Sequence, residues 1–222
     1  MALGLNYGSA GGDFLPILKY DARAGRFFRV DKENGESTSV DITRNIKFVA
    51  DFENVEVGFI MFPPGAAPQF HMVPLGTPLP AKPGPDFKQG VRLLVKLGAE
   101  SGGDVREIAS SAAAFLRGID ALHSAYEAGK AANPGKLPVV VCADTLPIES
   151  GSGAKKSTNY TPVFEITAWA PRPKDLEPKP RGGGDPMADT QPAPRAAPPS
   201  TGSTRAAPPP ARQAALVEDD FG

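Results

Sequence analysis

The residues of this chain whose types and spacing could do chemistry are cationic side chains placed near aromatic rings. Flat rings stack on unpaired bases, while neighbouring lysine and arginine side chains neutralise phosphates. Stacking contributes about 1–3 kcal/mol per base, so two or three exposed rings matter more than net charge. The candidates for these contacts are Arg23, Arg26, Phe28, Arg92, Lys96, Lys155, Lys156, Tyr160 and Trp169.

Each candidate also has an ordinary structural interpretation. A single lysine or arginine usually lies on a solvated face, and an aromatic ring usually packs in a core. Trp169 is opposite in parity to Phe164 and Ile166 of the same predicted strand. It therefore faces the surface or a groove if those two side chains are buried. Core packing is predicted for Phe27, Phe48 and Phe59.

Other kinds of site have weaker support. Residues 151–157 faintly resemble a phosphate loop, but Lys156 replaces the glycine that must precede the lysine, and a strand is predicted to follow. Cys142 is the only cysteine and adjoins three valines, which favours a buried hydrophobe. His71 has no Cys or Ser partner nearby, and His123 lies near an apolar helical stripe. We therefore predict no catalytic residues, no metal site and no cofactor.

The predicted elements that position the candidates are mainly strands. An N-terminal hairpin spans 14–20 and 26–30, with Gly25 suited to the turn. A loop is predicted over 63–86 and another over 149–159, because prolines or polar residues dominate there. Further strands are predicted over 46–52, 55–62, 91–97, 137–146 and 160–170. In strand 91–97, the odd-numbered residues face one way, and Arg92, Leu94 and Lys96 face the other.

One helix is predicted over 104–131. Asp104 and Glu107 resemble a capping box, and an apolar stripe with a period of 3.6 residues follows. Asn133-Pro134-Gly135 ends the helix. A helix between the third and fourth of five strands is the arrangement of an OB-fold barrel. The fold predicted is thus mainly β with one helix: an OB-fold-like five-stranded barrel with an extra N-terminal hairpin, some other α+β fold being the alternative.

The chain divides into four parts by composition. We predict a flexible N-terminus (1–12), the β-rich domain (13–170), a disordered Pro-rich linker (171–212) and an acidic-aromatic tip (213–222). The linker could span roughly 30–40 Å as a flexible chain. The net charge is −1, so a nucleic-acid binder would need a local basic patch. The tip carries Glu218, Asp219, Asp220 and Phe221.

This order of barrel, linker and tip resembles single-stranded DNA-binding proteins, most closely the bacteriophage type. Residues 20–27 (Tyr-Asp-Ala-Arg-Ala-Gly-Arg-Phe) are similar to the hairpin region of such proteins. The resemblance implies that the tip recruits replication or repair proteins and occupies the DNA groove until DNA displaces it. Family tips end on the aromatic residue, whereas Gly222 follows Phe221 here.

The function expected is sequence-independent binding and protection of single-stranded DNA during replication, recombination or repair. No signal peptide and no membrane-spanning run is evident, so a cytoplasmic location is expected, that of the bacterial host if the chain is phage-encoded. The sequence leaves open whether the chain forms a homo-oligomer. One alternative is a non-enzymatic phage structural or assembly protein. A second is a nuclease, for which Asp51, Glu53 and Glu56 are the only carboxylate cluster.

Overall fold

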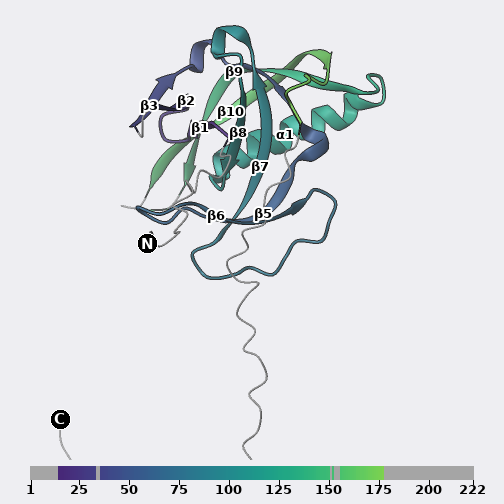
Figure 1. Cartoon of the computed structure of the whole chain (residues 1–222). Helices are drawn as coiled ribbons and strands as arrows, with labels where there is room; N and C mark the ends of the chain where they lie inside the picture. Colours follow the sequence, from purple (N-terminus) through teal and green to yellow (C-terminus); the bar gives the residue numbers. More distant parts are fainter. Residues whose placement is uncertain (1–14, 34–35, 151, 153–155, 178–222) are drawn as a thin grey trace, which may run out of the picture. The chain divides into compact units, whose positions relative to one another are not determined.

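The computed structural model of the chain describes residues 15–33, 36–150, 152 and 156–177. These residues form a mixed ten-stranded sheet and a single long helix (Figure 1). The first strands are β1 (Ile17–Asp21), β2 (Arg26–Glu33), β3 (Glu36–Asp41), β4 (Lys47–Ala50) and β5 (Glu56–Met61). The later ones are β6 (Gln69–Pro74), β7 (Lys88–Leu97), β8 (Val105–Ser110), β9 (Lys136–Ser150) and β10 (Ser157–Pro171). The helix is α1 (Ala113–Lys130).

Strand β7 is the centre of the sheet. The main path runs β10-β9-β4-β7-β8-β1-β2-β3, and β5 and β6 branch from it. One edge of β7 pairs with β8, while the other pairs with β4 over 95–97 and with β5 over 88–92. β1 pairs with β8 in parallel, and the other described pairs are antiparallel. The sheet is open, so the predicted five-stranded barrel is not confirmed, although a mainly β fold with one helix is.

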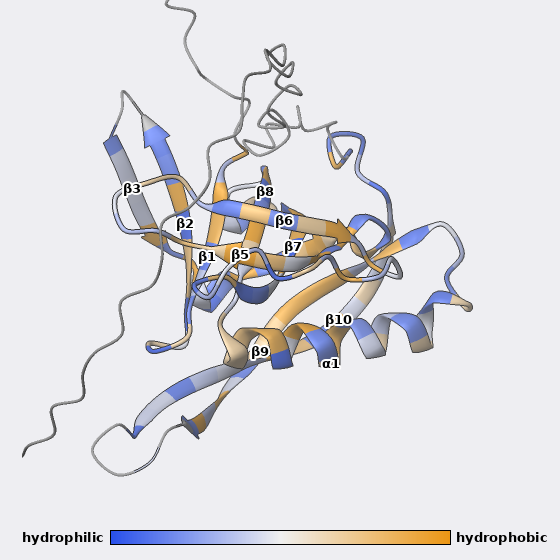
Figure 2. Ribbon diagram, turned by 90° about the horizontal axis from the view of Figure 1, so that it is seen from below, coloured by the Kyte–Doolittle hydropathy of each residue, from blue (hydrophilic) through white to orange (hydrophobic). Residues whose placement is uncertain are grey.

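The core lies between the curved sheet and α1, which packs across β10 (Figure 2). The odd-numbered apolar residues of β7 are buried in it, as their alternation predicts. Gly118 lets the helix approach, because a Cβ there would lie 2.5 Å from the carbonyl oxygen of Pro162. Burial of each large apolar side chain contributes about 1.5–3 kcal/mol. The largest fully buried side chains include those of Phe27, Phe48, Phe115, Leu122 and Tyr126; Phe59, also predicted to be buried, is half-exposed.

The predicted helix over 104–131 is wrong in its first part, where the chain forms β8. Val105 and Ile108 are three residues apart, as in a helical stripe, but the buried residues of β8 are Arg106 and Ile108, two apart. Asp104 does not cap a helix; it pairs with Arg106 at 2.8 Å. The backbone amide of Glu107 donates to Pro16. Pairing with β7 and β1 therefore outweighs the local helical pattern.

Two predicted loops also contain strands. The stretch 63–86 includes β6, which pairs with β5 over its whole length. The stretch 149–159 is entered by β9 and β10, each 15 residues long. Long-range pairing supplies these strands, which the prolines of 63–86 and the polar residues of 149–159 conceal in the local sequence pattern.

The C-terminal boundary of the domain also differs from the prediction at 170. β10 ends at Pro171, and the next residues pack on the outer face of the sheet instead of beginning a disordered linker. Leu176 is fully buried against Leu94 and Leu137. The rest of the predicted linker, the tip and residues 1–12 lie outside the described residues. Among those described, no helix is long and apolar enough to span a membrane.

Candidate nucleic-acid interface

The outer face of the β1–β2 hairpin carries an aromatic ring beside cationic side chains. Phe28 lies directly opposite Lys19, and Arg26 lies opposite Asp21 two residues along. Residues two apart share a face, so Arg26 and Phe28 point the same way. Phe28 is half-exposed, and Lys19 is exposed with no ion-pair partner among the described residues. A base could stack on this ring while Lys19 meets its phosphate.

A hollow of about 870 Å³ adjoins this hairpin. Arg26, Arg29 and Arg44 line it, together with the polar Thr43 and Asn45 and the carboxylates Asp41 and Glu100. Guanidinium groups match phosphate oxygens in geometry and charge, so three of them around one hollow suit a phosphodiester. The volume is within the range of small-molecule sites, which is enough for a nucleotide.

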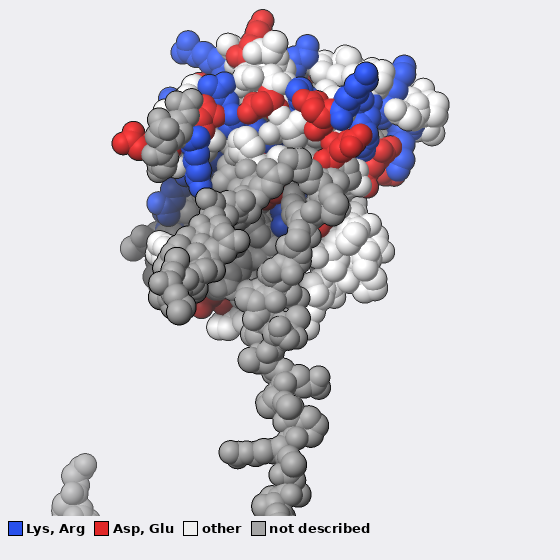
Figure 3. Space-filling model, viewed as in Figure 1, with Lys and Arg blue, Asp and Glu red and all other residues white. Residues whose placement is uncertain are grey.

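Acidic neighbours balance part of this charge. Arg26 pairs with Asp41 at 3.0 Å, and Arg29 pairs with Asp31 at 2.9 Å. Hydrogen bonds from Thr43, with the pairing to Arg26, lower the pKa of Asp41. Arg44 is exposed, and no residue of the described part pairs with it. Figure 3 shows basic and acidic side chains interspersed over the visible described surface, without a broad basic field.

The β1–β2 turn lies against the β9–β10 hairpin, which brings Arg23 near Tyr160. The backbone amide of Tyr160 donates to Ala22 at 2.7 Å, and the Tyr20 hydroxyl donates to the carbonyl of Tyr160 at 2.8 Å. Gly25 has φ 65°, and a Cβ there would lie 3.1 Å from the Cβ of Tyr160. Arg23 is exposed at this turn. The structure thus places Arg23 and Tyr160 at the turn of the hairpin, whereas Arg26 and Phe28 lie along its outer face.

The other predicted cations are paired. Lys156, on the β9–β10 hairpin, pairs with Glu149 at 2.6 Å. Arg92 pairs with Glu56 at 2.7 Å and lies over the ring of Phe70, 4.9 Å from its centroid. Lys96 pairs with Asp175 of the segment that follows β10. Arg92 and Lys96 do face outward, as predicted, but neither joins the group at the β1–β2 turn. Lys155 and the tip residues lie outside the described residues.

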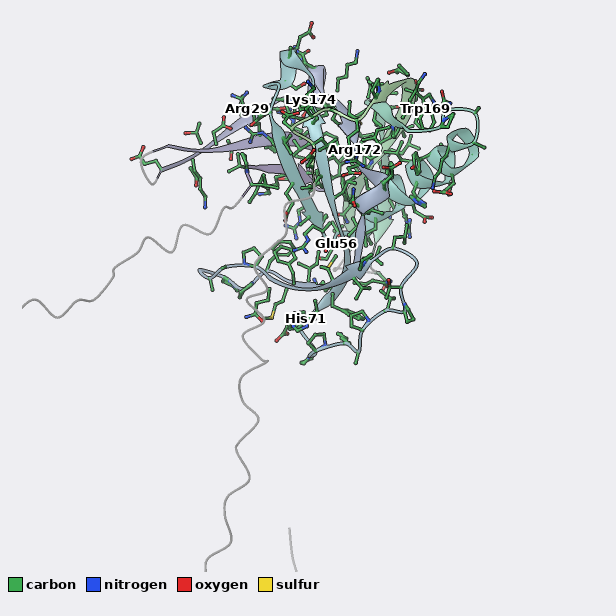
Figure 4. All side chains as sticks on the ribbon, turned by 45° about the vertical axis from the view of Figure 1, so that its right-hand side comes forward. Arg29, Glu56, His71, Trp169, Arg172 and Lys174 are labelled. Carbon is green, nitrogen blue, oxygen red and sulfur yellow. The ribbon has the colours of Figure 1, made fainter. Side chains whose placement is uncertain are left out.

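Trp169 lies on the other side of the view from Arg29 in Figure 4. Its ring stacks on Tyr126 of α1, with centroids 5.8 Å apart and planes at 28°. A Cβ on Gly129 would lie 2.5 Å from its Cζ2 atom. The parity argument assumed a regular strand, but the register of β10 shifts between Val163 and Phe164 and again between Ile166 and Ala168. These irregularities turn Trp169 back toward the helix.

The carboxylates considered for a nuclease are bound by arginines. Arg172 donates to Asp51 at 2.6 Å and to Glu53 at 2.8 Å, and Glu56 holds Arg92. Asp51 is fully buried. No group of three or more potential metal ligands occurs among the described residues.

Sequence reasoning missed Lys19, Arg29 and Arg44. Lys19 could have been found, because a turn over 21–26 fixes a register that puts residue 19 opposite residue 28. Arg29 and Arg44 could not, because the hollow forms where β2 meets the short 3₁₀ helices Thr43–Asn45 and Ala99–Ser101.

Comparison with protein-family models, with curated proteins and with solved structures finds no match to this chain. Support for a function therefore comes from the geometry of this surface and the chemistry of its residues.

Proposed function

We propose that this protein binds single-stranded DNA without sequence preference, through the outer face of the β1–β2 hairpin and the adjoining arginine-lined hollow. The observation that carries the proposal is the half-buried ring of Phe28 opposite Lys19, which has no ion-pair partner among the described residues. Arg26 shares this face and also lines the adjoining hollow with Arg44. An aromatic ring on a sheet stacks on the face of an unpaired base, whereas neighbouring base pairs cover the base faces in a duplex. The lysine and arginine side chains around this ring would bind the phosphate backbone of the DNA.

The residues of the proposed surface differ from the candidates predicted from the sequence. It includes Arg23, Arg26, Phe28 and Tyr160, and it adds Lys19, Arg29 and Arg44. Trp169 is left out because its ring packs on α1. The acidic tip Glu218–Phe221 remains part of the proposal as a segment that recruits replication or repair proteins and competes with DNA for this surface.

Replacement of the ring tests this function. We expect Phe28→Ala to weaken binding to oligo-dT by about tenfold, because one stacking contact contributes about 1–3 kcal/mol. Phe62→Ala is the control, since Phe62 is a solvent-accessible phenylalanine that lies outside the proposed interface. Fluorescence anisotropy with labelled oligo-dT measures both. Equal losses in the two variants, or equal affinity of the parent protein for duplex and single strand, would contradict the proposal.

A structural or assembly protein is the second candidate. One observation favours it: the hairpin of β5 and β6 and the loop after it form a largely uncharged, poorly buried surface. Such a surface indicates contact with protein rather than with DNA. The two candidates are separated by the oligo-dT measurement, because an assembly protein without the proposed interface would not bind.

A further inference from the structure

The segment comprising β5, β6 and the loop to residue 86, which we call the β5–β6 arm, is uncharged over most of its length. From Val57 to Ala81 it contains no Asp, Glu, Lys or Arg, and His71 is its only titratable side chain. In Figure 3 the described surface at the lower right, below the charged region, is white. Between Val57 and Ala81 the arm thus has no charge with which to attract a charged partner or to repel its own copy.

The apolar residues of the arm are poorly covered. None of residues 61–86 is buried, although this stretch includes Phe70, Met72 and Val73. Phe62, Leu75 and Leu79 are 50%, 46% and 47% exposed. Six large hydrophobic side chains are exposed in the described structure, and these are three of them. Exposed apolar clusters of this kind mark protein contacts.

The outer edge of β6 has unpaired backbone groups. Among the described strands, β6 pairs only with β5. The amide of Leu75 donates to Val55 at 3.0 Å, so the odd-numbered residues of β6 bond to β5. The even-numbered residues then direct their amides and carbonyls outward. No hydrogen bond from a described residue reaches the outward groups of Phe70 and Met72.

Prolines limit this open edge at both ends. Pro68 and Pro74 occupy the outward positions before Phe70 and after Met72, and proline has no amide hydrogen to donate. Only Phe70 and Met72 can therefore exchange backbone hydrogen bonds with another strand. A ladder here is short, and the register that pairs Phe70 with Met72 is the one in which the amides and the carbonyls of both residues are all used.

We propose that β6 pairs antiparallel with β6 of a second copy of this chain, so that Phe70 of each copy bonds with Met72 of the other. His71 then lies opposite His71 of the second copy at the two-fold axis. The contact is isologous and closed, because the prolines prevent further extension. A second copy fits better than another partner because the register is self-complementary and the uncharged arm avoids like-charge repulsion. The inference does not depend on DNA binding.

Cysteine cross-linking tests the register. In a Cys142→Ser background, His71→Cys should form a disulfide-linked dimer under mild oxidation, because opposed residues of a non-hydrogen-bonded pair have Cα atoms about 4.5 Å apart. Val73→Cys is the matched control on the same side of β6. In the proposed register the two copies of residue 73 are about 13 Å apart, too far for a disulfide. Cross-linking of residue 73 equal to that of residue 71 would overturn the register and the proposal.

Removal of one outward donor tests the interface itself. Met72→Pro deletes that amide without touching the bonds to β5, and should raise the dimer dissociation constant at least tenfold. Met72→Thr keeps the amide and should leave the dimer intact. Light scattering over a concentration series should give about twice 23.2 kDa for the parent chain. A monomeric parent chain, or a Met72→Pro variant as dimeric as Met72→Thr, would refute pairing through β6.

Discussion

At the scale of residues, the most constrained group is Asp51, which is fully buried with Arg172 as its counter-ion. Arg172 donates to both carboxylate oxygens at 2.6 and 2.7 Å, and Asn54 donates to the same carboxylate. The hydrogen bond to Asp51 raises the pKa of Arg172 further above its ordinary value, so the guanidinium stays charged. Removing one partner of a buried ion pair leaves an uncompensated charge in the core.

We expect Arg172→Ala to lower the free energy of unfolding by about 3 kcal/mol, because the buried Asp51 loses its main ion-pair partner. Lys174→Ala is the control: Lys174 is exposed, in the same segment, and has no ion-pair partner among the described residues. Adding Asp51→Asn to Arg172→Ala should restore part of the loss. Urea denaturation measures all three variants. If Arg172→Ala and Lys174→Ala unfolded alike, the pair would have no structural role.

At the scale of elements, the β9–β10 hairpin connects the helix to the rest of the sheet. Its body lies against α1, where Trp169 stacks on Tyr126, and its other end meets the β1–β2 turn through Tyr160. The hairpin therefore holds the proposed interface in place from one side. Trp169 contributes to that support and not to the interface.

Trp169→Ala should destabilise the domain by about 3 kcal/mol, the lower end of the range for large aromatic residues in cores, because its ring is only partly buried. Thermal unfolding followed by circular dichroism checks this. Oligo-dT affinity, measured well below the transition temperature, should be unchanged. A variant that kept its stability but lost DNA affinity would return Trp169 to the binding surface.

At the scale of the whole molecule, the net charge of −1 means that any binding to DNA is local. The three acids near the C-terminus, Glu218, Asp219 and Asp220, can mimic phosphates, and Phe221 can mimic a base. Both would be drawn to the same cations and ring that we propose for DNA. The strength of that competition should depend on salt, because screening weakens contacts between exposed charges.

Deletion of residues 213–222 should therefore strengthen binding to oligo-dT at low salt, by several-fold, and the gain should shrink as salt is added. The matched control replaces Glu218, Asp219 and Asp220 with the neutral amides and keeps the length of the tail. Anisotropy titrations at two salt concentrations give both comparisons. Unchanged affinity in the deletion variant at low salt would exclude self-competition.

The sequence by itself determined the local features of this protein. Alternation along β7 identified which residues face the core, and Gly25 identified the β1–β2 turn, because strand periodicity and left-handed backbone are local properties. The tertiary structure alone decided the rest. Pairing turned 105–110 into a strand, register shifts turned Trp169 inward, and packing placed Leu176 and Asp175 over the outer face of β7. Each of these features depends on contacts between residues that are far apart in the chain. The energies of these contacts exceed the local propensities, and no periodic pattern in the sequence indicates them.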